Sequence, residues 1–171
     1  PNMERLALSP DARWVATGTW HGTGVKIWDA RTGAHVRDLP IAGNAAVVFS
    51  PEGRRLLTAS GTDYMIWDCA TWSALVQIPR TRTSGLPGVA AFSPDGGMLA
   101  LARTRIEVAL VDSATGRELA TLEPLDPQNV AGLGFSPDAR YLVVTCNASR
   151  IEAWDLDALR DGLRPLGLDW P

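Results

Sequence analysis

The sequence of 171 residues repeats one short pattern four times, and this repeat restricts the possible fold more than any other feature. A Ser-Pro pair followed by Asp or Glu occurs at Ser9, Ser50, Ser93 and Ser136. A second marker, two or three hydrophobic residues that end in Asp, keeps the same phase at Asp29, Asp68, Asp112 and Asp155. Markers in constant phase indicate a repeat protein with about 40–45 residues per unit.

Each unit is predicted to form four short antiparallel strands. Ser-Pro-Asp-Gly favours a type I turn, because Pro fixes φ at the second position and Asp and Gly suit the next two. Apolar, β-favouring segments such as 45–49 and 56–60 flank this turn. A third segment such as 64–67 leads into an Asp-x-x-Thr-Gly turn or its variant, followed by a more polar segment. The apolar first strand is expected inside and the alternating fourth strand at the outer edge.

Four-stranded units of this length that stack radially form a β-propeller. The chain resembles the WD40-repeat family, whose Trp-Asp pair stands at Trp28-Asp29, Trp67-Asp68 and Trp154-Asp155. The resemblance implies an all-β propeller of WD40 type with four consecutive four-stranded blades at about 1–40, 41–83, 84–126 and 127–156. A short helix and a tail are expected over 157–171.

The fourth unit shows no convincing fourth strand. Closed WD40 propellers commonly take that strand from the start of the domain, and the family usually closes with about seven blades. We therefore expect the chain to be the C-terminal part of a larger ring, with the closing strand upstream. An isolated array of this kind should expose apolar faces at both ends and self-associate, for example as two copies in one ring.

Composition argues against several classes of function. The net charge of −3 gives no overall positive field for nucleic acid or an anionic membrane, and no apolar run is long enough to cross a bilayer. Cys69 and Cys146 form neither a metal-ligand cluster nor a disulfide framework and are expected as buried residues in a reducing compartment. Without a secretory signal in the sequence, a cytoplasmic location is predicted.

No catalytic motif is present in the sequence. It has no nucleophile elbow, zinc-protease motif or phosphate-binding loop, and no nucleophile or carboxylate is suggested near its two histidines, His21 and His35. No catalysis, cofactor or metal is therefore expected in this segment. The repeated aspartates Asp29, Asp68, Asp112 and Asp155 are expected to cap turns, and Trp28, Trp67 and Trp154 to pack between blades.

Binding is the function that the pattern favours, and two candidate surfaces lie on one rim of the predicted propeller. Arg80, Arg82, Arg103 and Arg105 belong to connections of the second and third units, where they could hold an acidic or phosphorylated peptide. An ordinary solvated surface is the alternative. Trp20 and His21 occupy a glycine-flanked loop, either as a contact anchor or folded over their own blade.

The predicted function is a protein-interaction module, a scaffold or sensor, of a larger bacterial protein. One alternative is the regulatory C-terminal region of a serine/threonine protein kinase, because the tail at 163–171 resembles tails that follow WD40 regions in large bacterial multidomain proteins, some with such kinases. A second alternative is a propeller accessory domain of a periplasmic or hydrolytic protein. The partner is expected to be a protein or peptide of unknown identity.

Overall fold

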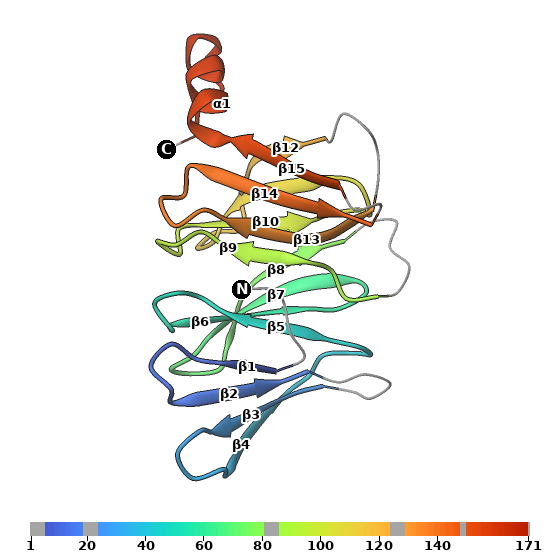
Figure 1. Ribbon diagram of the computed structural model, residues 1–171. Coiled ribbons are helices and arrows are strands. Elements are labelled where there is room, and N and C mark those ends of the chain that lie inside the picture. The colour runs from blue at the N-terminus through green and yellow to red at the C-terminus, as the bar shows by residue number, and fades with distance from the viewer. Residues whose placement is uncertain (1–5, 19–23, 81–85, 124–128, 148–149, 171) are drawn as a thin grey trace.

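The computed structural model describes residues 6–18, 24–80, 86–123, 129–147 and 150–170, which form four antiparallel sheets placed side by side (Figure 1). Within these residues the first three sheets have four strands each and the fourth has three. We call the sheets the first to fourth blades. The strands are β1 (Leu6–Leu8), β2 (Trp14–Thr17), β3 (Val25–Asp29), β4 (His35–Leu39), β5 (Ala46–Phe49), β6 (Arg55–Ala59), β7 (Asp63–Asp68), β8 (Ala74–Pro79), β9 (Ala90–Phe92), β10 (Met98–Ala102), β11 (Val108–Asp112), β12 (Glu118–Leu122), β13 (Val130–Phe135), β14 (Tyr141–Cys146) and β15 (Arg150–Asp155).

The strands of each blade pair in sequence order, so every blade is an antiparallel meander. The predicted all-β propeller architecture of consecutive blades is confirmed, and a short helix follows the fourth blade. This helix, α1 (Leu156–Leu163), precedes a 3₁₀ turn (Arg164–Leu166) at the end of the array. No helix among the described residues is long and apolar enough to span a bilayer.

The turn between the first two strands of a blade is held by a serine and an aspartate. In the first blade Ser9 Oγ donates to Asp11 Oδ1 at 2.6 Å and accepts the Trp14 amide at 2.8 Å. Ser93 and Asp95 repeat the side-chain bond in the third blade, and Ser136 and Asp138 repeat it in the fourth. These bonds hold the pKa of each aspartate below its ordinary value.

The turn between the third and fourth strands depends on the repeated aspartates. Asp68 Oδ1 accepts both the amide and the hydroxyl of Thr71, at 2.7 and 2.9 Å, and these bonds lower the pKa of Asp68. Asp29 and Asp112 accept the same pair of bonds from their threonines. In the fourth blade Asp155 instead accepts the Ala158 amide at 3.0 Å and forms the N-cap of α1.

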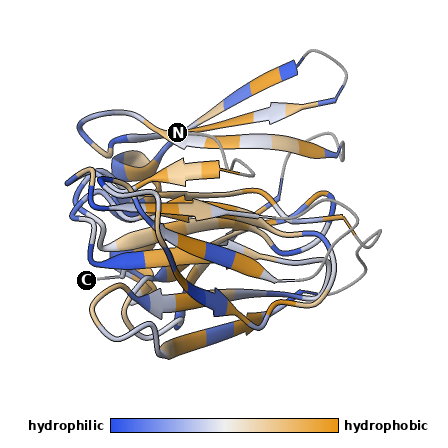
Figure 2. Cartoon of the chain, turned by 90° about the horizontal axis from the view of Figure 1, so that it is seen from below, coloured by the Kyte–Doolittle hydropathy of each residue, from blue (hydrophilic) through white to orange (hydrophobic). Residues whose placement is uncertain are grey.

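The hydrophobic core consists of three clusters, one between each pair of neighbouring blades. In the first cluster Val25 and Ile27 of the first blade pack with Leu56 and Trp67 of the second. Hydrophobic residues accordingly recur along the strands, in places alternating with polar ones, and hydrophilic residues gather at many of the turns (Figure 2). Each blade therefore buries its apolar faces against the neighbouring blades.

A buried hydrogen bond accompanies the tryptophan of the repeat. Trp67 Nε1 donates to Thr58 Oγ1 at 3.0 Å, and both side chains are buried. Trp28 and Thr17 form the same bond at 3.0 Å in the first blade, on the face turned away from the second blade, where both are half-buried. At the corresponding positions of the third blade stand Val111 and Leu101, both buried. In the third blade donor and acceptor are thus replaced together by apolar residues.

We expect Thr58→Val to lower the free energy of unfolding by about 1–3 kcal/mol, because it leaves the buried Trp67 indole N–H without its acceptor. Thr17→Val is the matched control. Because Trp28 is partly accessible to water, this variant should lose less of the free energy of unfolding. Urea denaturation followed by tryptophan fluorescence measures both. Equal losses in the two variants would contradict the prediction.

Candidate functional site

A cavity of about 250 Å³ lies on one rim of the array, where the second, third and fourth blades meet. It is lined by the segment after β8, the β10–β11 hairpin and the start of β13. Arg80 and Arg105 contribute the charged side chains, and Thr104, Asn129 and Asn147 contribute polar ones. The cavity therefore combines two cations with neutral hydrogen-bonding groups.

Arg80 is held in place by backbone carbonyls and an aromatic ring. Its Nη1 donates to the carbonyl oxygens of Ser60 at 2.6 Å and Leu86 at 2.8 Å. The guanidinium carbon lies 5.4 Å from the centroid of the Tyr64 ring. Its buried Nε has no hydrogen-bond partner among the described residues. Carbonyl dipoles and a ring face thus stabilise this charge, and no carboxylate of the described residues lies within ion-pairing distance.

Tyr64 links the second blade to the third just beside the cavity. Its hydroxyl lies 2.9 Å from the carbonyl oxygens of both Val89 and Ala102, to which it donates. Burial raises the pKa of Tyr64 above its ordinary value, so the phenol stays a donor. A Cβ on Gly88 would lie 2.1 Å from this hydroxyl oxygen, so the close approach requires glycine at that position.

The other rim arginines have different surroundings. Arg105 is exposed, and its carbonyl oxygen accepts the Val130 amide at 2.8 Å, which joins the third blade to the fourth. Arg103 forms an ion pair with Glu118 of β12 and does not line the cavity. The Thr121 hydroxyl and Arg103 lower the pKa of Glu118. Of the four arginines predicted from the sequence, the structure brings Arg80 and Arg105 together.

Three predicted site residues, Trp20, His21 and Arg82, lie outside the described residues. Sequence reasoning missed the polar partners Asn129 and Asn147, and it missed the supporting roles of Tyr64 and Gly88. The repeat register carries a signal for Asn147, since it follows the second strand of the fourth unit as Arg103 follows that of the third. No three His, Cys, Asp or Glu side chains of the described ranges gather in a group that could hold a metal ion.

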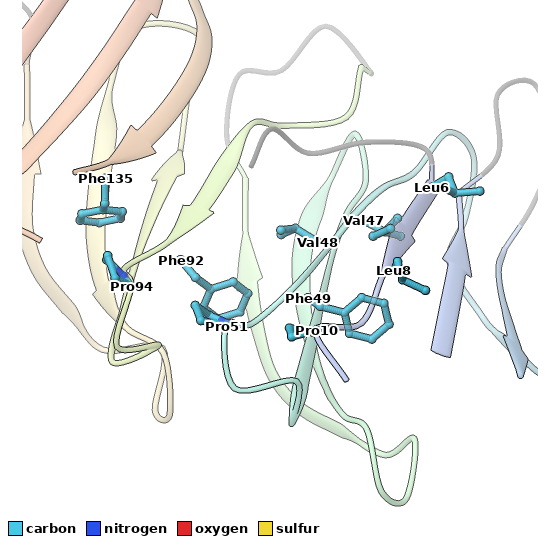
Figure 3. A pocket seen from close by; sticks show the side chains of 11 residues that line it. Leu6, Leu8, Pro10, Val47, Val48, Phe49, Pro51, Phe92, Pro94 and Phe135 are labelled. Carbon is cyan, nitrogen blue, oxygen red and sulfur yellow. The ribbon is translucent and has the colours of Figure 1, made fainter. Parts of the chain in front are cut away.

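A second, apolar groove of about 510 Å³ runs along the inner strands. In it the Phe side chain of one blade lies over the Pro of the preceding blade, as Phe49 lies over Pro10 and Phe92 over Pro51 (Figure 3). Phe135 lies beside Pro94 in the same way. The described residues that line this groove are apolar.

Comparison with known proteins gives further evidence on the family and fold that the repeat and the meander blades indicate. The chain is 33% identical over 125 residues to transcription initiation factor TFIID subunit 5 of Caenorhabditis elegans, a match that covers 70% of this chain. The structure of hydrazine synthase from Kuenenia stuttgartiensis matches with a TM-score of 0.74 over 91% of the chain at 16% identity, which shows the fold alone. The chain is a WD40-type β-propeller.

No protein-family model matches the WD40 chain. It spans 18% of the length of the TFIID subunit and 46% of the hydrazine synthase chain. The activity and partners of those longer proteins therefore do not transfer to it directly.

We expect Gly88→Ala to destabilise the joint between the second and third blades by about 1–3 kcal/mol, because the new methyl group displaces the Tyr64 hydroxyl from its two carbonyl acceptors. Gly134→Ala is the control, since a Cβ there meets no atom within 4 Å. Chemical denaturation compares the two. Equal free energies of unfolding for Gly88→Ala and Gly134→Ala would contradict the prediction.

Proposed function

We propose that this WD40 chain is a non-catalytic protein-interaction module that binds an acidic segment of a partner protein in the rim cavity. The observation that carries the proposal is the pair of arginines, Arg80 and Arg105, in one cavity without a carboxylate of the described residues within ion-pairing distance. A carboxylate from a partner would supply the missing counter-charge. Guanidinium groups suit this ligand because they donate two parallel hydrogen bonds to it.

The surroundings of the two arginines support a peptide ligand. Arg80 is fixed by its two carbonyl bonds, so little side-chain entropy is lost when a ligand binds to it. Arg105 is exposed and adapts to the ligand. Leu86, whose side chain is also exposed, offers an apolar contact at the edge of the cavity. An acidic residue flanked by an apolar one therefore fits the site.

The comparison supports an assembly role in general terms. The nematode relative is by name a subunit of an initiation factor, that is, one component of a larger complex. We extend this to a scaffold or sensor role within a larger cytoplasmic protein, and we include self-association of the isolated chain in the proposal. The apolar residues on the open side of the first blade support self-association, since Leu6 and Leu8 are exposed where Val47 and Phe49 of the second blade are buried.

Charge reversal at the cavity tests the proposal. With fluorescein-labelled octaglutamate as the probe, we expect Arg105→Glu to weaken binding by about tenfold or more, because a charge-assisted hydrogen bond is replaced by repulsion. Arg117→Glu is the matched control, since this exposed arginine follows the turn between β11 and β12 on the opposite rim. Fluorescence anisotropy gives both affinities. Equal affinities for the two variants would remove the cavity from the proposed function.

A further inference from the structure

The chain turns back on itself after helix α1, at the end of the array that carries the fourth blade (Figure 1). The 3₁₀ turn that follows α1 ends at Gly167, whose φ of 69° lies in the left-handed region. The Leu168 amide then donates to the carbonyl oxygen of Leu163 at 3.2 Å, back into the last turn of α1. This bond and the left-handed glycine are typical of a helix end where the chain changes direction. We call residues 167–170 the return segment.

An aspartate of the return segment is held by two arginines. Arg160 Nε of α1 donates to Asp169 Oδ1 at 3.0 Å, and Arg164 Nε donates to Oδ2 at 3.4 Å. Arg160 Nη2 also donates to the carbonyl oxygen of Trp170 at 2.8 Å. These bonds lower the pKa of Asp169, chiefly through Arg160. Arginines four positions apart lie on the same side of a helix, so together they hold one carboxylate and the main chain of the next residue.

The residue after this aspartate is buried. Trp170 is 4% exposed and belongs to the hydrophobic cluster between the third and fourth blades. The Arg160 guanidinium carbon lies 5.7 Å from the centroid of its ring. Leu168 of the same segment is 61% exposed. The return segment is therefore anchored by one acidic and one aromatic side chain.

Helix α1 has its own attachment to the blades. Leu156 is buried in the cluster that contains Trp170, and Leu159 and Leu163 pack against that cluster. The Leu156 amide donates to the carbonyl oxygen of Arg140 at 2.8 Å, which ties the start of the helix to the fourth blade. We therefore expect the helix and its arginines to stay in place when the return segment leaves.

We infer that α1 and the cluster between the third and fourth blades form a binding site for an Asp-Trp segment, which residues 169–170 occupy as a releasable strap. A partner segment with Asp followed by an aromatic residue offers the same groups and competes for the site. The strap is favoured by its high effective concentration, because it is linked to the site by a few residues. Arg160 and Arg164 do not line the rim cavity, so this site goes beyond the proposed function.

A labelled peptide that copies residues 166–171, Leu-Gly-Leu-Asp-Trp-Pro, tests the inference on the 171-residue chain. The double variant Asp169→Ala/Trp170→Ala empties the site, so it should bind the peptide about tenfold or more tightly than the wild type does. Leu166→Ala/Leu168→Ala is the matched control, because both leucines are exposed and the strap stays in place. This control should exclude the peptide as the wild type does. Fluorescence anisotropy gives the affinities.

A third substitution tests the role of the arginine. Added to Asp169→Ala/Trp170→Ala, Arg160→Leu should weaken peptide binding about tenfold, because it removes two charge-assisted hydrogen bonds. Arg117→Leu, at an exposed arginine between β11 and β12, should leave the affinity unchanged. A peptide with Trp170→Ala should not bind. Equal peptide affinities for the wild type and Asp169→Ala/Trp170→Ala would overturn the inference, as would an Arg160→Leu protein that binds with full affinity.

A milder variant keeps the test valid if the double variant unfolds. Asp169→Ala alone retains the buried indole, and we expect its peptide affinity to lie between those of the wild type and the emptied site. Arg105→Glu should leave peptide binding unchanged whether or not the rim cavity binds an acidic segment. If the peptide binds to no folded variant, the return segment is a fixed part of the core and the inference is overturned.

Discussion

The structure depends on apolar contact between neighbouring blades, because no blade is thick enough to form a core alone. Each described cluster takes side chains from two successive blades, and the inner Phe-Pro contacts follow the same scheme. Stability in such an array is a sum of repeat terms and nearest-neighbour interface terms. The turns, caps and rim loops are positioned by these interfaces, so a change at one interface affects two blades.

In the second and third blades, buried hydrogen-bond donors and acceptors between blades are either both present or both replaced by apolar residues. The Trp67 and Thr58 bond in the second blade is replaced by Val111 and Leu101 in the third, so neither blade leaves a buried donor alone at this position. The buried Tyr64 hydroxyl has backbone acceptors instead, since it donates across the interface to the carbonyls of Val89 and Ala102. A ligand in the rim cavity beside this hydroxyl would therefore stabilise the joint between the second and third blades as well as its own site.

Much of the fold was predictable because the repeat supplies four independent readings of one pattern. The Ser-Pro-Asp turns and the Trp-Asp markers were enough to predict the meander blades. The candidate site was predictable only in part. Sequence spacing placed Arg80 and Arg105 on one rim, but the pairing of Arg103 with Glu118 depends on the register between the β10–β11 hairpin and β12. Arg80's bonds to Ser60 and Leu86 likewise depend on backbone geometry that no motif encodes.

The aspartate that ends the third strand is followed by a strand in three blades and by a helix in the fourth. Where a threonine hydroxyl stands three residues after the aspartate, as at Thr71, the aspartate closes a tight turn and another strand begins. In the fourth blade the same place is taken by Ala158, which has no hydroxyl, and Asp155 caps a helix through the backbone amide alone. The same aspartate position thus serves two kinds of element, closing a turn before a strand in three blades and capping a helix in the fourth. One carboxylate at a fixed place in the repeat is therefore compatible with two different continuations of the chain.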